Sequence, residues 1–530
     1  MAEPNVFGTA EGTDHNILWT PVEDSVYLQE ASRIVKTDAP VTSVAVNDGT
    51  MYGVMNGRLH TLQGEQLVPV AGLDAAVAKL VELDGALWAL GSGLHRLTGA
   101  TWQTLADGDF RDVTSLRGEV YALRNNALFH VSADGAMEEL AGGEGGRAPN
   151  NMLAIEPYAE SLYILRPGGL VIYTFDGFDD VHIFDWGQLP SQDLRDIMAV
   201  GGRLYIATAK GIGQLRGMAL TNIQGEDGLP YEETTCLAHG FAGDMWIGTE
   251  GGAVRYVDGD FQLFPSTRWL PVDQVNAIAC GDNVTYVATD AGLGIIDYEP
   301  YTLLKKAAYY EQRLEEYGHK RLGFTHKLEW EDDAGEWVRE ISDNDAGYSC
   351  HYLSAMCFKY AATGDESARK EAVNSFLSQV WVEQATPIEG FPARSMWAKG
   401  EKGHQAQHGS GGLPAEWHNT ADGKFEWKGD TSSDETDAHF YAVATFHDLV
   451  AKGEEKEMAA RHLNRIASHI MENGFLLRDI DGQPTRWARW DPEYLQRPYG
   501  FYARGLNGME IFNYLRTAEV ISDDPKFQAG

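Results

Sequence analysis

An internal repeat in the first 300 residues limits the possible folds more than any other feature of this 530-residue sequence. A short strand pattern, with an aromatic residue between two apolar or small residues, recurs seven times at intervals of 33 to 42 residues. The aromatic residues are Tyr52, Trp88, Tyr121, Tyr163, Tyr205, Trp246 and Tyr286. Each pattern follows a short apolar strand and precedes a glycine-rich turn with a further strand. Such strands at a period of about 40 residues are typical of β-propeller blades. The repeats therefore predict a seven-bladed β-propeller over residues 1–300.

The residues before the first repeat have a predicted role in closing this propeller. Residues 25–36 (SVYLQEASRIVK) have the composition of a strand. We expect this strand to complete the last blade, because the pairing removes an exposed sheet edge. The repeated aromatic residues are interpreted as packing between neighbouring blades, since large rings at one fixed place per repeat fill that space.

One repeat carries a family resemblance. Residues 246–256 (WIGTEGGAVRY) resemble the blades of bacterial two-component-regulator-type propellers. Propellers of that family often serve as extracellular sensor modules. The resemblance thus implies a propeller fold, and a non-catalytic sensor role is kept as an alternative.

The hydrophobic period changes from strand-like to helical after Pro300. The predicted helices are 301–319, 346–363, 366–384, 433–451, 454–473 and 506–521. Gly364-Asp365 and Lys452-Gly453 mark short connections within two helix pairs. Paired helices of this kind predict an α/α hairpin array. The expected fold class is therefore multidomain, with an all-β propeller followed by an all-α, partial-toroid domain over residues 301–530.

The charge of the chain excludes several classes of partner. Lys and Arg total 42 and Asp and Glu total 78, so the formal net charge is −36. Such a surface repels phosphate backbones and anionic lipids. No run of 18 apolar residues is present, so we expect neither nucleic-acid binding nor membrane insertion.

The first residues bear on the compartment. The start, MAEPNVFG, has neither the basic region nor the apolar region of a secretory signal. That leaves a cytosolic protein or one whose signal has been removed, and we expect a secreted or periplasmic location.

Paired carboxylates are the first candidate chemistry. Two predicted helices open on acidic segments, 342–347 (SDNDAG) and 429–435 (GDTSSDE). Glycoside hydrolysis needs two carboxyl groups, about 5 Å apart in retaining enzymes and about 6.5–9.5 Å apart in inverting ones. Asp345 and Asp434, one step inside each helix, are the predicted catalytic pair. The other acidic residues are interpreted as helix caps or parts of a capping box: Asp343, Asp430 and Glu435.

Elimination at a uronate sugar is the alternative enzymatic chemistry. It needs a base for the C5 proton, a group that neutralises the carboxylate and an acid for the leaving oxygen. His418 and His439 are the predicted catalytic residues of this alternative, and His351, Tyr348 and Arg394 are further candidates. Asn344 is predicted to stabilise the enolate-like charge.

Aromatic and arginine side chains supply the predicted sugar-binding surface. Sugar faces pack on aromatic rings, and Arg binds a carboxylate through two parallel hydrogen bonds. The predicted substrate-binding residues are Asn344, Tyr348, Arg394, Trp397, Trp417, Trp427, Arg486, Trp487 and Trp490. Several lie between residues 390 and 430, a stretch without periodicity that we expect to be a functional loop.

A metal site is not predicted. His404 and His408 have i, i+4 spacing, but no Glu follows the first His as it does in an HExxH motif. The surrounding glycines also disfavour a helix there. We therefore expect neither a metal nor another cofactor.

The second half also carries a resemblance. Its segments DND, GFPARS, EWH, GDTSSDE, TRWARW and PEY, between residues 343 and 510, are similar to the (α/α)-toroid modules of carbohydrate-active enzymes. This resemblance implies a sugar cleft and a hydrolase or a polysaccharide lyase. The sequence thus predicts an enzyme that cleaves glycosidic bonds of a poly- or oligosaccharide, with hydrolysis by paired carboxylates as the first choice. A lyase and a non-catalytic glycan-binding or sensor protein are the alternatives.

Overall fold

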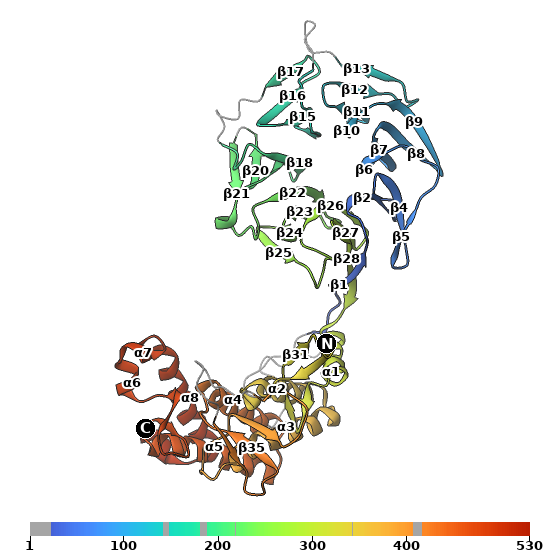
Figure 1. Cartoon of the computed structure of the whole chain (residues 1–530). Coiled ribbons are helices and arrows are strands. Elements are labelled where there is room, and N and C mark those ends of the chain that lie inside the picture. Colours follow the sequence, from blue (N-terminus) through green and yellow to red (C-terminus); the bar gives the residue numbers. More distant parts are fainter. Residues whose placement is uncertain are drawn as a thin grey trace, which may run out of the picture. The chain divides into compact units, whose positions relative to one another are not determined.

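A computed structural model describes residues 23–140, 148–180, 188–217, 219–341, 343–405 and 416–529. The chain forms two compact units that divide after Tyr301. One is a β unit, Val26–Tyr301, and the other is a helical unit that contains Thr302–Gly530. Each unit is described by itself below (Figure 1).

The β unit consists of four-stranded antiparallel sheets, and its described residues contain seven of them. The first four sheets contain β2 (Val41–Asn47), β3 (Thr50–Met55), β4 (Arg58–Gln63), β5 (Gln66–Pro69); β6 (Val77–Leu83), β7 (Ala86–Gly91), β8 (Gly93–Thr98), β9 (Thr101–Asp107); β10 (Phe110–Leu116), β11 (Glu119–Arg124), β12 (Leu128–Val131), β13 (Met137–Glu139); β14 (Ala154–Tyr158), β15 (Ser161–Arg166), β16 (Gly169–Tyr173) and β17 (Phe178–Asp180). The other three contain β18 (Leu194–Val200), β19 (Arg203–Thr208), β20 (Gly211–Arg216), β21 (Ala219–Ile223); β22 (Thr234–His239), β23 (Met245–Thr249), β24 (Gly252–Val257), β25 (Asp260–Phe264); β26 (Val275–Gly281), β27 (Val284–Thr289), β28 (Gly292–Tyr301) and β1 (Tyr27–Lys36).

The innermost strands of these sheets follow one another around a common centre (Figure 1). Strand β2 contacts β6, the contacts continue through β10, β14, β18 and β22 to β26, and β26 contacts β2 again. This arrangement is propeller-like, as the repeat predicted. Strand β1 is the fourth strand of the last sheet and pairs antiparallel with β28. Tyr27 lies opposite Tyr301 at one end of this pairing, and Lys36 lies opposite Gly292 at the other. The prediction that residues 25–36 complete the last sheet is thereby confirmed.

The repeated aromatic residues lie on the second strand of each sheet and fill the core between sheets. Trp88 and Trp246 are almost fully buried. Tyr121 and Ile164 of the next sheet belong to one apolar cluster, as expected if the aromatic residues pack between neighbouring sheets. Six of the seven aromatic residues are buried, and Tyr52 is half-buried.

Side chains at one repeated position, most of them polar, lie along the innermost strands. They occupy the third position of each innermost strand: Ser43, Lys79, Asp112, Glu156, Asp196, Cys236 and Ala277. Four of them accept a hydrogen bond from a backbone N–H of the following sheet. For example, Asp112 Oδ2 accepts from Ile155 at 3.1 Å and Glu156 Oε1 accepts from Ala199 at 2.9 Å. These bonds fix each sheet against its neighbour.

The helical unit contains eight α-helices in its described residues: α1 (Leu303–Glu316), α2 (Asp345–Thr363), α3 (Glu366–Gln384), α4 (Ser433–Leu449), α5 (Glu454–Glu472), α6 (Pro492–Gln496), α7 (Pro498–Phe501) and α8 (Arg504–Ser522). Short strands accompany them: β29 (Lys320–Arg321), β30 (Phe324–Thr325), β31 (Leu328–Glu331), β32 (Glu336–Arg339), β33 (Ser395–Ala398), β34 (Trp417–Asn419), β35 (Phe425–Lys428), β36 (Leu476–Arg478) and β37 (Pro484–Arg489). The expected all-α domain is therefore corrected, because residues of the predicted long loop form the sheet β33-β35-β34.

The longer helices match their predictions because their end signals are local. Helix α2 ends at Gly364, which adopts a left-handed φ of 71° that favours glycine. Asp365 then caps α3 by accepting from Ser367 N–H. Helix α3 consequently has the predicted bounds.

Packing in the helical unit centres on α2 and α4. Helix α2 contacts α3 and α4, and α5 contacts α4 and α8. Phe376 of α3 stacks on Phe446 of α4 with ring centroids 4.1 Å apart. One large apolar cluster runs through these helices and the β33–β35 sheet. No helix in the described ranges has the length and apolar character needed to cross a bilayer.

Candidate functional site

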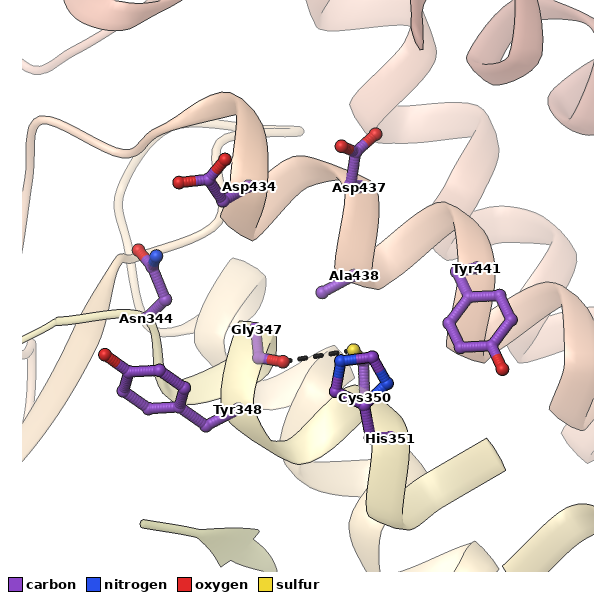
Figure 2. Close-up of a pocket in the computed structure, with 9 residues that line it drawn as sticks. All are labelled: Asn344, Gly347, Tyr348, Cys350, His351, Asp434, Asp437, Ala438 and Tyr441. Atoms are coloured by element: carbon purple, nitrogen blue, oxygen red, sulfur yellow. Dashed lines mark hydrogen bonds between the residues drawn. The ribbon is translucent and has the colours of Figure 1, made fainter. Parts of the chain in front are cut away.

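A pocket of about 400 Å³ opens between the first turns of α2 and α4 (Figure 2). Its volume is within the range of about 300–1,000 Å³ typical of small-molecule sites. The lining residues are Asn344, Gly347, Tyr348, Cys350, His351, Asp434, Asp437, Ala438 and Tyr441. Asn344, Tyr348, His351 and Asp434 are predicted site residues or candidates that the structure brings together here.

Helical spacing explains why these side chains meet. On α2, Tyr348 and His351 are three residues apart, and Asn344 precedes Tyr348 by four. On α4, Asp434 and Asp437 are three residues apart. Residues three and four apart lie on one helix face with Cβ atoms about 5–6 Å apart. Figure 2 shows the carboxyl group of Asp434 projecting toward the side of Asn344, whereas that of Asp437 points away from α2.

The beginnings of α2 and α4 are tied together by Glu435. Its carboxyl oxygens accept hydrogen bonds from Ala346 N–H at 2.9 Å and Gly347 N–H at 2.8 Å. Glu435 is fully buried, and burial raises its pKa well above the ordinary value although the two N–H donors oppose this rise. Glu435, which the sequence predicted to cap its own helix α4, therefore caps the beginning of α2 instead. The N-cap of α4 is Ser432, whose hydroxyl accepts from the Glu435 N–H.

Asp437 belongs to a buried network behind the pocket. Tyr514 donates its hydroxyl hydrogen to Asp437 Oδ1 at 2.6 Å, and Asp437 also hydrogen-bonds with Glu510. The indole N–H of Trp490 donates to Glu510 Oε2 at 2.8 Å. Burial raises the pKa of Asp437, and that of Glu510 to about 7. The pair therefore holds a proton near neutral pH, when ordinary carboxyl groups have lost theirs.

Asp434 lies in a different environment. Its side chain is exposed, whereas Asp437 is half-buried. Two carboxyl groups on one wall of the pocket thus differ in their contact with water. Such a difference is what separates an acid role from a base role in paired carboxyl groups.

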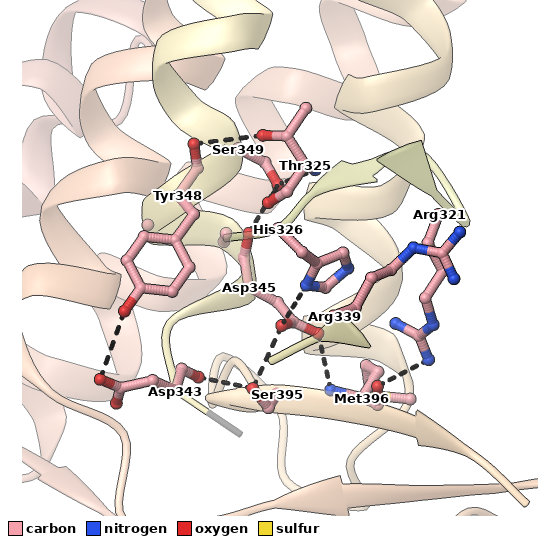
Figure 3. A network of polar contacts seen from close by, with 12 residues as sticks. Arg321, Thr325, His326, Arg339, Asp343, Asp345, Tyr348, Ser349, Ser395 and Met396 are labelled. Atoms are coloured by element: carbon pink, nitrogen blue, oxygen red, sulfur yellow. Dashed lines mark hydrogen bonds and ion pairs between the residues drawn. The ribbon is translucent and has the colours of Figure 1, made fainter. Parts of the chain in front are cut away.

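The rim of the pocket carries an ion pair. Arg394 Nε donates to Asp343 Oδ1 at 3.0 Å, and Arg394 Nη1 donates to the carbonyl of Asp430 at 3.2 Å. The hydroxyl of Tyr348 lies 3.5 Å from Asp343 Oδ2 (Figure 3). Burial, followed by the charge of Asp343, raises the pKa of Tyr348 to about 12. Asp343 therefore pairs with Arg394 rather than capping a helix.

Asp345 does not line the pocket. Its carboxyl group turns the other way, toward β33, where it accepts from Met396 N–H at 2.9 Å and Ser395 Oγ at 3.2 Å (Figure 3). Asp345 is only 1% exposed, and burial raises its pKa to about 7. The expected Asp345–Asp434 pair is consequently not present in the pocket. Its place beside Asp434 is taken by Asp437.

The two predicted catalytic histidines lie elsewhere. His439 is fully buried, with its Nδ1 3.0 Å from Nε2 of His462, and burial lowers its pKa to about 3. This core histidine cannot exchange protons with a pocket ligand. His418 lies on β34, where its ring packs against Trp427 with centroids 4.5 Å apart. His408 lies outside the described residues, and His404 is paired with Glu329 at 3.1 Å.

The predicted aromatic platform is divided between core and surface. Trp427 and Trp490 are buried, so neither presents a face to a sugar. Trp487 is 39% exposed, and Trp397 and Trp417 are half-buried on β33 and β34. Arg486 next to Trp487 is engaged with Asp430, with Nε 2.7 Å from Oδ2. These residues do not line the pocket between α2 and α4.

Three important residues were missed in the sequence. Asp437 and Tyr441 stand three and seven residues after Asp434, so helical spacing alone would have placed them on the same face. Glu510 has no such signal, since it lies on α8 and reaches Asp437 only through the packing of α8 on α4.

Solved structures are similar to about half of this chain. No family model and no curated protein matches the chain. Among solved structures, the chain is similar to virginiamycin B lyase from Staphylococcus aureus, with 14% identity, 52% of this chain and 99% of that chain covered, and a TM-score of 0.41. It is also similar to the extracellular domain of a hybrid two-component system from B. thetaiotaomicron, with 16% identity, coverage of 49% and 39%, and a TM-score of 0.44. The chemistry of the pocket is therefore interpreted from its own residues.

Proposed function

We propose that this chain is a carbohydrate-active enzyme that hydrolyses glycosidic bonds of an oligo- or polysaccharide in the pocket between α2 and α4. Asp437 is the general acid and Asp434 is the nucleophile or general base. The observation that carries this proposal is the presence of two carboxyl groups on one wall of the pocket in unlike environments. Paired carboxyl groups of this kind are what glycoside hydrolysis requires.

The assignment of roles follows from the surroundings of each carboxyl group. Burial, followed by the charge of Asp434, raises the pKa of Asp437, although the hydrogen bonds with Tyr514 and Glu510 oppose the rise. The raised pKa favours the protonated form that a general acid needs. Asp434 is exposed and faces the pocket, where its ionised form can attack the sugar or activate water. Tyr514 and Glu510 position Asp437 from behind.

The remaining lining residues fit a sugar ring. Tyr348 is 36% exposed and Tyr441 is 47% exposed, so each offers an aromatic surface to an apolar sugar face. Asn344 and His351 add hydrogen-bonding groups for hydroxyls.

The charge of the pocket selects among sugars. Its nine lining residues in the described chain include two aspartates and neither Lys nor Arg. Arg394 at the rim is paired with Asp343. A uronate carboxylate would be repelled here, so the substrate is a neutral or amino sugar, and hydrolysis is favoured over elimination.

The proposal extends to the closure of the propeller and the arrangement of the helix pairs. We infer that the seven sheets are the blades of one closed propeller. We also infer that the pairs α2–α3 and α4–α5 are hairpins of a partial α/α toroid. Both inferences rest on the order of contacts between elements.

The test uses a panel of neutral, amino and uronate polysaccharides with two readouts, new reducing ends and the ultraviolet absorbance of unsaturated uronates. We expect reducing ends without absorbance. Asp434→Asn and Asp437→Asn should each lower kcat at least about 100-fold. The matched control is Asp365→Asn at the N-cap of α3, because Asn caps a helix as well as Asp does.

Three outcomes would contradict the proposal. Absorbance together with reducing ends would mean a lyase. Binding of a polysaccharide without any product would mean a non-catalytic glycan-binding protein. Full activity of both aspartate variants would move the reaction away from this pocket.

A further inference from the structure

We propose that Glu416, His418 and Asp479 form a binding site for one divalent transition-metal cation, Zn²⁺ or Mn²⁺, in the helical unit. Glu416 immediately precedes β34, His418 lies in that strand, and Asp479 immediately follows β36. One ligand atom from each residue lies within 4.8 Å of the other two. This site is separate from the pocket between α2 and α4 and shares no lining residue with it.

His418 supplies the first observation. Its Nε2 atom is buried and has no hydrogen-bond partner in the described part of the chain. The ring is held in place by Trp427, whose ring plane is tilted 35° to it. A buried imidazole nitrogen without a partner costs free energy unless a donor or a cation satisfies it. Neutral imidazole is also the commonest protein ligand of transition metals.

Asp479 supplies the second observation. It is 8% exposed, and its two oxygens are aligned by backbone donors, Oδ2 by Asp430 N–H at 2.6 Å and Oδ1 by Ile480 N–H at 2.7 Å. A carboxylate oriented by fixed donors is typical of a ligand that is organised before the metal arrives. Among the described residues Asp479 forms no ion pair with Lys or Arg.

Gly429 shows that the backbone makes room for this carboxylate. A Cβ atom at this position would lie 2.4 Å from Asp479 Oδ2. Residue 429 must therefore lack a side chain for Asp479 to point into the cluster.

The charge around the three residues favours a cation. The carboxylates of Asp479, Asp481 and Asp430 lie close enough to Glu416 to interact with it electrostatically. Arg486 is engaged with Asp430 at the edge of this group. Like charges at such short range repel one another, and a bound cation would offset this repulsion.

The donor set indicates the kind of ion. One imidazole nitrogen and two carboxylate oxygens suit Zn²⁺ or Mn²⁺ better than Ca²⁺, which prefers oxygen donors only. Ligand atoms at about 2.1 Å from one ion lie roughly 3–4 Å apart. Since the three ligand atoms lie within 4.8 Å of one another, binding requires them to close by at most about 1–2 Å, a movement that the exposed side chain of Glu416 permits.

A second cluster of the same residue types provides a matched control. His404 lies between Glu329 and Glu331, and each of its ring nitrogens is paired with one of these carboxylates. Its side chain is 39% exposed. Since both nitrogens already have partners, this cluster is not expected to bind a cation tightly.

The test measures metal binding directly and needs no enzymatic activity. The full chain is treated with a chelator, dialysed, and titrated with ZnCl₂ and separately with MnCl₂ in a calorimeter, with the melting temperature recorded at saturation. We expect one tight site for at least one of the two metals and a rise in melting temperature. His418→Ala and Glu416→Gln should weaken binding at least tenfold and abolish the rise, whereas His404→Ala should leave both unchanged.

The outcomes that overturn the proposal are specific. They are the absence of binding of both metals, undiminished binding in both Glu416→Gln and His418→Ala, and loss of binding in His404→Ala. The exposed position of Glu416 keeps the test valid if His418→Ala fails to fold. Because the readout is binding, its result does not depend on whether the pocket between α2 and α4 hydrolyses a glycoside.

Discussion

Lys79 Nζ lies 2.7 Å from Asp112 Oδ1, and this ion pair joins the third residues of two neighbouring innermost strands, β6 and β10. Lys79 is the one lysine among the seven third positions, which also contain Asp112, Glu156 and Asp196. The pKa of Lys79 is raised, because the attraction of these carboxylates outweighs the opposing effect of burial. One cation thus offsets several carboxylates near the centre of the β unit.

Replacing this lysine tests its role in stability. We expect Lys79→Met to lower the free energy of unfolding of the β unit by about 1–3 kcal/mol. This loss is smaller than the loss expected when one partner of a fully buried ion pair is removed, since 40% of the Lys79 side chain is exposed. Urea unfolding followed by tryptophan fluorescence measures the change. Lys36→Met, an exposed lysine on β1, should leave stability within about 0.5 kcal/mol. Equal effects of the two substitutions would show that the pair with Asp112 is unimportant.

Glu156 gives the β unit a predicted dependence on pH. Burial raises its pKa from 4.5 to about 8, with the neighbours Asp112 and Asp196 adding to the rise and Lys79 opposing it. Between these two values the folded chain retains a proton that the unfolded chain releases. Stability should therefore fall as the pH rises from about 4.5 to about 8, with a slope of up to about 1.4 kcal/mol per pH unit.

The matched variant for this dependence is Glu156→Gln. It keeps an oxygen that can accept from Ala199 N–H but has no proton to lose. Its free energy of unfolding, measured by urea titration at pH 5, 7 and 9, should vary less with pH than that of the wild type. An identical pH dependence in the two proteins would assign the effect to other groups.

Tyr514→Phe tests the network behind the pocket. The Tyr514 hydroxyl lowers the pKa of Asp437, so its removal should raise that pKa. If Asp437 is the general acid, the alkaline limb of the pH–kcat profile moves to higher pH. Tyr352→Phe, which removes a hydroxyl bonded to Glu371 instead, should leave the profile in place. A fall in kcat at all pH values without a shift would indicate a structural role only.

Glu435 is predicted to stabilise the meeting of α2 and α4. Glu435→Ala leaves the buried N–H group of Ala346 and the partly buried N–H group of Gly347 without their acceptors, so we expect a loss of roughly 2–4 kcal/mol in the free energy of unfolding. Glu435→Gln keeps the volume and one carbonyl acceptor and should cost less. Chemical denaturation followed by circular dichroism at 222 nm compares them with Glu454→Ala, an exposed residue of α5. A loss no larger in Glu435→Ala than in Glu454→Ala would contradict the predicted capping role.

The fold was predictable where its signals are local. The repeated aromatic strands indicated the four-stranded sheets, and the Gly364-Asp365 pair indicated where α2 ends and α3 begins. The pairing of residues 25–36 with β28 followed from the need to cover a sheet edge. Each of these inferences uses the period or the end signals of one segment.

The site was predictable only in part, because side-chain direction at a helix start depends on what packs there. Asp345 and Asp434 occupy similar positions in sequence, but Ser395 and Met396 of β33 bind the carboxyl group of Asp345 from fifty residues away. Trp427 and Trp490 are residues of the type that binds sugar faces, but both are buried in the core. Glu416 and Asp479 meet only because two short strand pairs bring together segments sixty residues apart.

The antiparallel pairing of β1 with β28 has a mechanical consequence. Tyr27 and Tyr301 are direct partners at one end of this ladder, so the chain enters and leaves the β unit at the same edge. Tension applied between these two residues would load the hydrogen bonds one at a time, starting from the Tyr27–Tyr301 pair, rather than all together in shear. The pair of Arg33 with Asp297, 2.6 Å apart, is a side-chain contact within this ladder that the unzipping would also break. Under force, the β unit should therefore open first at its closure and yield at a lower force than a ladder pulled from opposite ends.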